Sequence, residues 1–144
     1  MSDKQPDLDL IQLVQRARMA HDAAATPSQV SAVYWLEAKP EGAAADQRPP
    51  TPRAGRFVIE TTVDQIDALW ARIKAATQAG QLGYKSKVST ASRRAGTGGA
   101  DRVIYVLTAD AEDRADVERV RAALIALGMP EPLVYARVDE DAGR

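Results

Sequence analysis

The fold is decided by one segment, residues 63–90, with the sequence VDQIDALWARIKAATQAGQLGYKSKVST. In its first half, apolar residues recur at spacings of three and four, which predicts an amphipathic helix with one buried stripe. The stripe consists of Val63, Ile66, Leu69, Trp70 and Ile73. Gly80 and Gly83 end the helix. Residues 84–90 then alternate, which predicts a strand with Tyr84, Ser86 and Val88 on one face and Lys85, Lys87 and Ser89 on the other.

The rest of the chain alternates strands and helices around this segment. β-Branched and aromatic stretches predict strands at residues 32–38, 57–60, 102–107 and 133–138. Helical spacing predicts a short helix over residues 8–22 and a longer one with Val117, Val120, Leu124 and Leu127 on its buried stripe. Because both long helices have one apolar stripe, we expect them to pack on the same face of an antiparallel or mixed sheet. The other sheet face stays open, and Lys85, Lys87 and Ser89 project there if Val88 faces the helices.

Two further features bear on what this sheet face carries. Residues 39–55 hold four of the eight prolines and no large apolar side chain, which predicts a mobile loop that does not pack. Trp35 lies within a predicted strand and Trp70 on a helical stripe, so we expect both to pack in or against the core.

Length and composition limit the chemistry. The 144 residues are enough for one domain, predicted over residues 29–139, with an N-terminal helix and linker at 1–28 and an acidic tail at 140–144. Absence of cysteine excludes disulfides, thiolate nucleophiles and cysteine-ligated metals. His21 is the single histidine, so one chain has no histidine cluster, and we expect no metal and no cofactor. No apolar run reaches the roughly 18 residues of a membrane span, and the N-terminus lacks a secretory pattern, so we expect a cytoplasmic protein.

Charge is unevenly distributed along the chain. The net charge of −1 predicts neither bulk nucleic-acid binding nor membrane binding. Between residues 84 and 102, however, five basic residues oppose one acidic residue, a local balance of +4, whereas residues 108–144 carry nine acidic residues and five arginines. The basic residues are Lys85, Lys87, Arg93, Arg94 and Arg102. One interpretation is a solvated strand whose lysines deter edge pairing; the other is an anion-binding site.

Four stretches together resemble a known family. They are VYWLEAKP at 33–40, the deciding segment at 63–90, DRVIYVLTADAEDRADVERVRAALIALG at 101–128 and PLVYARVD at 132–139. In this order they resemble the basophilic leukaemia-expressed protein (Bles) family, which is similar in fold to the mRNA cap-binding translation initiation factors. The resemblance runs from about residue 31 to residue 139. It implies an α+β fold, with a curved antiparallel or mixed sheet, helices packed on the convex face and a ligand groove on the concave face.

The resemblance also implies a set of ligand-binding residues. In the cap-binding factors, the strand equivalent to residues 84–90 and the loop after it carry basic residues that hold the nucleotide phosphates. Carried over, this implies a basic pocket on the concave face formed by Lys85, Lys87, Ser89, Arg93, Arg94 and Arg102. Cap binding also needs two tryptophans around the base, but residues 39–55 contain no aromatic residue where the first should lie. We therefore expect a phosphate pocket without base stacking, for a phosphorylated small molecule, nucleotide or phosphopeptide.

Two alternatives use the same residues differently. Some relatives of the family are labelled phosphothreonine lyase domains, which implies β-elimination with Lys87 as the catalytic base. His21 lies among alanines in the predicted N-terminal helix and is interpreted as a surface or helix-packing residue, so Tyr84, Tyr105 or Tyr135 could donate the proton instead. The other alternative is a non-catalytic interaction domain whose basic strand contacts an acidic partner, or whose helical face, near Trp70, contacts a protein. The acidic residues around the second long helix are interpreted as helix caps rather than metal ligands: Asp110, Glu112, Asp113 and Asp116.

Overall fold

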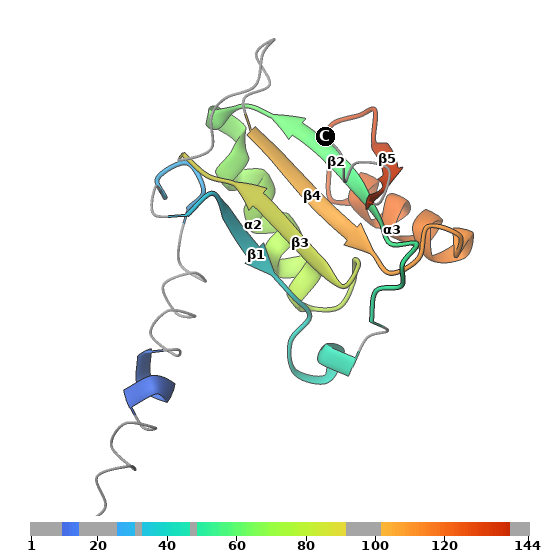
Figure 1. Cartoon of the computed structure of the whole chain (residues 1–144). Coiled ribbons are helices and arrows are strands. Elements are labelled where there is room, and N and C mark those ends of the chain that lie inside the picture. Colours follow the sequence, from blue (N-terminus) through green and yellow to red (C-terminus); the bar gives the residue numbers. More distant parts are fainter. Residues whose placement is uncertain (1–9, 15–25, 31–32, 47–48, 92–101, 139–144) are drawn as a thin grey trace, which may run out of the picture.

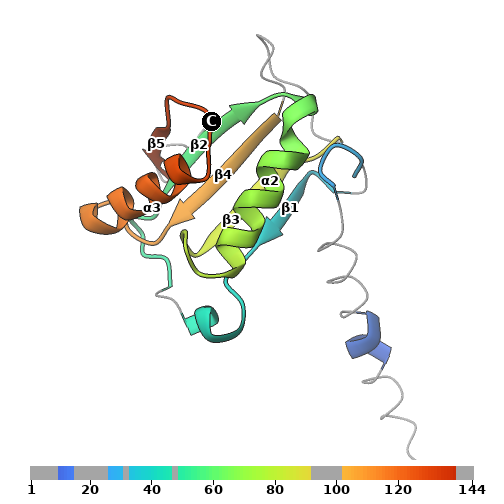
Figure 2. The ribbon, with the colours of Figure 1, turned by 180° about the vertical axis from the view of Figure 1, so that it is seen from behind.

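The computed structural model describes residues 10–14, 26–30, 33–46, 49–91 and 102–138. Five strands form one sheet in the order β1-β3-β4-β2-β5, and every neighbouring pair is antiparallel. The strands are β1 (Trp35–Ala38), β2 (Gly55–Thr61), β3 (Lys85–Ser89), β4 (Arg102–Thr108) and β5 (Val134–Arg137). Helices α2 (Val63–Gln78) and α3 (Arg114–Ala126) both cover one face of the sheet (Figures 1 and 2), so the predicted α+β architecture is confirmed.

The hydrophobic core lies between the sheet and the two helices. Ile66, Trp70 and Ile73 of α2 are at most 2% exposed, as the helical stripe predicts, whereas Val63 at the start of the stripe is 40% exposed. The predicted stripe of α3 is buried as far as Leu124, and Leu127 is partly buried at its end. Burial of each such large side chain contributes about 1.5–3 kcal/mol relative to exposure. Trp70 is therefore a core residue, as predicted.

The turn between α2 and β3 sets the register of the lysine-bearing strand. Gly80 adopts a φ of 78°, the left-handed conformation that ends a helix at low cost for glycine. Gly83 packs so closely against β4 that an added Cβ would lie 1.7 Å from the carbonyl oxygen of Leu107. The Tyr84 N–H donates to that same oxygen at 3.1 Å. This close approach starts β3 with Lys85 opposite Leu107 and places Lys87 opposite Tyr105.

The prediction that residues 39–55 do not pack is wrong for the end of the segment, residues 51–55. The segment begins with the short 3₁₀ helix η1 (Gly42–Asp46), and its far end is tied to the residues after β4. The N–H and hydroxyl of Thr51 both donate to the Ala109 carbonyl, at 2.9 and 3.0 Å. Arg53 donates two hydrogen bonds to the Asp110 carboxylate, at 3.0 and 2.7 Å. Hydrogen bonds and the ion pairs of Arg53 with Asp110 and Glu112, rather than apolar side chains, hold this end of the segment.

Several sequence predictions fall on residues that the structure does not describe. Residues 10–14 are helical, but most of the helix predicted over 8–22 lies outside the described residues, as does the tail at 140–144. The boundaries at 1–28 and 29–139 stay predictions. Within the described ranges, no helix has the length and apolar character required to cross a membrane.

Candidate functional site

The sheet face opposite the helices, called the open face below, carries the predicted lysines. Cross-strand partners in an antiparallel sheet share a face, so Glu37, Lys87 and Tyr105 form one row across β1, β3 and β4. Ser86 and Val88 are fully buried under the helices, whereas Lys85 and Lys87 are half-buried on the open face. The alternation predicted for β3 is therefore confirmed.

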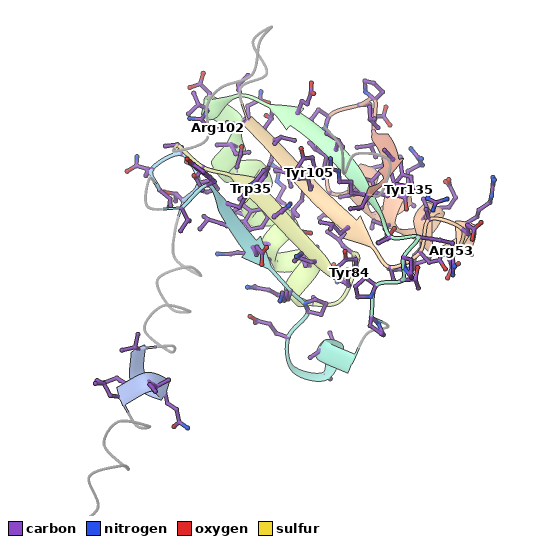
Figure 3. All side chains as sticks on the ribbon, viewed as in Figure 1. Trp35, Arg53, Tyr84, Arg102, Tyr105 and Tyr135 are labelled. Carbon is purple, nitrogen blue, oxygen red and sulfur yellow. The ribbon has the colours of Figure 1, made fainter. Side chains whose placement is uncertain are left out.

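Two aromatic rings and two cations gather on the open face, and we call Trp35, Lys87, Tyr105 and Arg56 the cation–ring cluster. The rings of Trp35 and Tyr105 have centroids 5.3 Å apart (Figure 3). The Lys87 Nζ lies 4.8 Å from the Trp35 centroid and 5.6 Å from the Tyr105 centroid. The Arg56 Cζ lies 4.0 Å from the Tyr105 centroid. Four strands thus contribute one side chain each to a compact patch in which both cations contact ring faces.

Trp35 corrects one sequence prediction, because it does not pack in the core. In β1, Leu36 and Ala38 face the helices and are about 5% exposed or less. Trp35 lies on the opposite side of the strand, and its ring reaches across β3 to Tyr105. The open face therefore has a tryptophan, but one that comes from a strand rather than from the loop at 39–55.

The structure places the other predicted ligand-binding residues differently. Lys85 lies on the open face with its Nζ 3.5 Å from a Glu37 carboxylate oxygen. Ser89 is 1% exposed, and its Oγ accepts the Val103 N–H at 3.0 Å. Arg93 and Arg94 lie outside the described residues. The structure thus brings Lys85 and Lys87 together and uses the Ser89 hydroxyl within the sheet.

Arg102 does not join the lysines, contrary to the expectation of one basic pocket. It pairs with Thr61 at the start of β4 and shares its side of the strand with Ile104 and Val106, which are fully buried. That side is the one covered by the helices. Arg102 is close to the lysines in sequence, but the alternation of side chains along β4 places it on the opposite face of the sheet.

Arg56 is a site residue that the sequence analysis missed. The predicted strand begins at Phe57, whereas β2 begins at Gly55 and therefore includes Arg56. Phe57 and Ile59 point to the core, whereas Arg56 and Val58, which alternate with them, point to the open face. A strand extended by two residues would have shown the alternation that places Arg56 beside Tyr105.

A groove of about 580 Å³ adjoins the cation–ring cluster. It runs over β2 and β5 and is bounded on one side by the turn after α3. Its lining residues are Arg56, Val58, Ile59, Glu60, Tyr105, Pro130, Glu131, Pro132, Val134 and Ala136. The open face therefore combines a cationic patch with an adjacent, largely apolar groove.

With this geometry in place, comparison with known proteins identifies the family. The sequence model described as "Basophilic leukemia-expressed protein Bles03" matches residues 48–135, which is more than half of the chain. The chain belongs to the Bles03 family. The matched region includes Arg56, Lys87 and Tyr105, and it begins after Trp35. No match is found among curated proteins.

The solved structure of a schistosome eIF4E shows that the Bles03 chain has an eIF4E-like fold. A schistosome eIF4E complexed with m7GpppA and 4E-BP aligns with a TM-score of 0.63 at 12% identity, over 91% of this chain and 74% of that one. An Ascaris suum eIF4E-3 with an m2,2,7G cap aligns with a TM-score of 0.46 at 17% identity, over 60% of this chain and 51% of that one. The schistosome structure confirms the fold that the sequence resemblance implies.

The three tyrosines considered as proton donors in the Bles03 chain lie in different places (Figure 3). The Tyr135 hydroxyl hydrogen-bonds to the Thr108 hydroxyl at 2.7 Å, and burial raises the pKa of Tyr135. Burial also raises the pKa of Tyr84, which precedes β3 at the end of the sheet. Tyr105 is the cross-strand partner of Lys87, and both side chains lie on the open face of the sheet. Among these three, Tyr105 is therefore the one that the open face offers beside Lys87, and His21 is outside the described residues.

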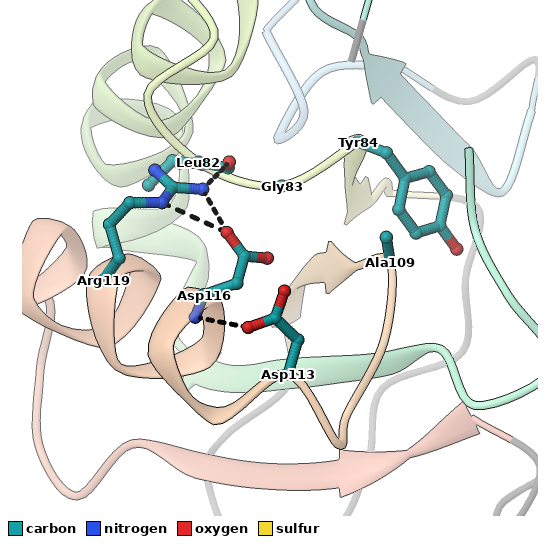
Figure 4. Close-up of a pocket in the computed structure, with 7 residues that line it drawn as sticks. All are labelled: Leu82, Gly83, Tyr84, Ala109, Asp113, Asp116 and Arg119. Carbon is teal, nitrogen blue, oxygen red and sulfur yellow. Dashed lines mark hydrogen bonds and ion pairs between the residues drawn. The ribbon is translucent and has the colours of Figure 1, made fainter. Parts of the chain in front are cut away.

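A second pocket, of about 290 Å³, lies where β3 begins and α3 begins (Figure 4). Arg119 donates to the Asp116 carboxylate and to the carbonyls of Gln81 and Leu82. Asp113 accepts the Asp116 N–H at 3.2 Å, so its predicted capping role is confirmed. The described part of the chain contains no group of three or more histidine, cysteine or acidic residues arranged to hold a metal. This pocket is a poor phosphate site, because Arg119 is already bonded to protein groups and the carboxylates of Asp113 and Asp116 line the pocket.

Proposed function

We propose that this Bles03-family protein binds a phosphorylated ligand on the open face of its sheet, with Lys87 and Arg56 contacting the phosphate. The observation that carries the proposal is that both cations flank the ring of Tyr105, with the Lys87 Nζ at 5.6 Å and the Arg56 Cζ at 4.0 Å from its centroid. The ring is thus contacted by two positive charges, one from each strand that neighbours β4. Arginine presents a planar fork of donors that matches phosphate, and lysine adds a compact charge.

The fold supports the proposal, and the placement of the remaining residues refines it. The schistosome eIF4E of this fold was solved with m7GpppA, a phosphorylated compound. Lys85 contributes less in our proposal, because Glu37 lies 3.5 Å from its Nζ. Arg93 and Arg94 keep the role predicted from the sequence, and the proposal rests on Lys87 and Arg56 rather than on Ser89 or Arg102.

Titration at low salt tests the proposal. The probes are a phosphothreonine peptide and a nucleoside triphosphate, each compared with its unphosphorylated form. Lys87→Ala is expected to weaken binding by about tenfold or more, the scale of one charge-assisted hydrogen bond. Binding is also expected to weaken as salt rises.

Arg114→Ala is the matched control, because Arg114 is an exposed cation on α3, on the other side of the sheet. It removes the same unit charge from the protein without touching the open face. Binding that is absent at low salt, or that Lys87→Ala and Arg114→Ala reduce equally, would contradict the proposal.

A further inference from the structure

The groove beside the cation–ring cluster has a defined direction along β2. Arg56, Val58 and Glu60 are alternate residues on the open side of that strand, and all three line the groove. On β5, Ala136 pairs with Arg56 and Val134 with Val58, so these small and apolar residues continue the floor. From Arg56 to Glu60 the groove therefore spans about four residues of an extended chain, or roughly 13 Å.

The two ends of the groove carry opposite charges. Arg56 and Tyr105 lie at one end, next to Lys87. Glu60 lies farther along β2 and lines the groove, as does Pro132 of the turn after α3. The exposed Glu131 adjoins this position and also lines the groove. Between the ends, Val58 and Val134 form the floor, and the exposed fraction of Val134 is 55%.

The aromatic pair in the cluster is arranged as a support for cations. The Trp35 and Tyr105 rings contact each other at 5.3 Å between centroids, Lys87 lies against both, and Arg56 lies on Tyr105. The ring faces on which these cations lie are not available to a stacked base. This arrangement favours a phosphate carried on an extended chain over one carried on a nucleoside.

We propose that the groove binds an extended phosphorylated peptide with a basic residue about four positions from the phosphorylated one, since an extended chain rises about 3.4 Å per residue. The phosphate contacts Lys87 and Arg56, an apolar side chain lies over Val58 and Val134, and the basic side chain contacts Glu60 and Glu131. This inference rests on the proposed function and names the ligand class for the same site. The occupant follows from charge complementarity, because one end of the groove is cationic, the other is anionic, and the floor between them is apolar.

Two synthetic phosphopeptides test the inference. Both carry phosphothreonine with a valine two positions to either side of it. One peptide has lysine four positions to either side of the phosphothreonine, and the other has glutamate at those positions. The lysine peptide is expected to bind the wild-type protein about tenfold more tightly, because like charges placed together are strongly unfavourable. The double variant Glu60→Gln, Glu131→Gln is expected to remove most of this difference while leaving phosphate-dependent binding in place.

Asp64→Asn provides the control, because Asp64 is an exposed acidic residue on α2, on the helical side. Circular dichroism melts of all variants check that the fold is kept. Equal binding of the two peptides to wild type would overturn the groove assignment and leave the phosphate proposal standing. Tighter binding of a nucleoside triphosphate than of either peptide would overturn the peptide class. Loss of all phosphate-dependent binding would instead overturn the proposed function.

Discussion

Arg56 on β2 lies over the ring of Tyr105 on β4, the neighbouring strand, with its Cζ 4.0 Å from the ring centroid. Lys87 approaches the same ring from β3 on the other side. Each such contact contributes about 0.5–2 kcal/mol, depending on how far it is shielded from water. Tyr105 thus connects the two cations of the proposed site without carrying a charge itself.

Replacing Tyr105 separates the role of its ring from that of its hydroxyl. Tyr105→Leu is expected to weaken binding of a phosphothreonine peptide about three- to tenfold, because both cations lose a contact worth about 0.5–2 kcal/mol that positions them. Tyr105→Phe keeps the ring and is expected to bind like wild type. Calorimetric titration measures both. Equal losses in the two variants would show that the hydroxyl, not the ring, matters.

The geometry around Lys87 also predicts that bound phosphothreonine is not eliminated. The Nζ of Lys87 lies against two ring faces, and our proposal uses it to hold the phosphate rather than to take the α-proton. A phosphothreonine peptide incubated with the protein is therefore expected to keep its mass. An unsaturated product lighter by phosphoric acid, formed by wild type and absent with Lys87→Ala, would restore the elimination hypothesis.

The part of the site on β3 could be predicted from the sequence, because Lys85 and Lys87 alternate with residues that are plainly small or apolar. The face of Trp35 could not, since residues 33–36 are all apolar and their pattern does not distinguish one side of the strand from the other. Arg56 was missed because the predicted strand began at Phe57, one residue too late to include it. The start of the strand at Arg102 was predicted correctly, and its alternation puts Arg102 on the side of Ile104 and Val106, so closeness in sequence to the lysines was the misleading signal.

The packing of residues 51–54 could not be predicted from the sequence for a different reason. Apolar composition predicts burial of side chains, but this segment is held by hydrogen bonds from Thr51 and Arg53 to residues that follow β4. These partners are 57 or 58 positions away in sequence. No local pattern in the segment indicates them.

Gly83 is expected to be far more sensitive to substitution than Gly42. In Gly83→Ala the new Cβ would lie 1.7 Å from the backbone oxygen of Leu107, so β3 and β4 must separate, at a cost of about 3 kcal/mol or more. In Gly42→Ala the Cβ meets nothing within 4 Å, and only the φ of 60° is unfavourable, costing about 1–2 kcal/mol. Urea unfolding compares the two variants. Similar losses would mean that the turn before β3 does not set its register.

The buried phenols predict how stability depends on alkaline pH. Burial raises the pKa of Tyr84 and of Tyr135 above the ordinary value of 10.0. Below pH 10 both phenols are neutral whether the chain is folded or unfolded, so their contribution to stability is complete. Above that pH the unfolded chain loses these protons first, and the free energy of unfolding is expected to fall as pH rises toward the folded-state values.

Urea unfolding between pH 9 and pH 11 measures this slope, and tyrosinate absorbance follows the ionisation. The double variant Tyr84→Phe, Tyr135→Phe is expected to have a shallower slope, because two of the groups that couple folding to protons are gone. Loss of the hydrogen bond to Thr108 lowers its stability at every pH, so the slope rather than the level is the readout. Tyr34→Phe, at a position 65% exposed, controls for the removal of a phenol. A double variant as steep as wild type would contradict the assignment of the alkaline loss to Tyr84 and Tyr135.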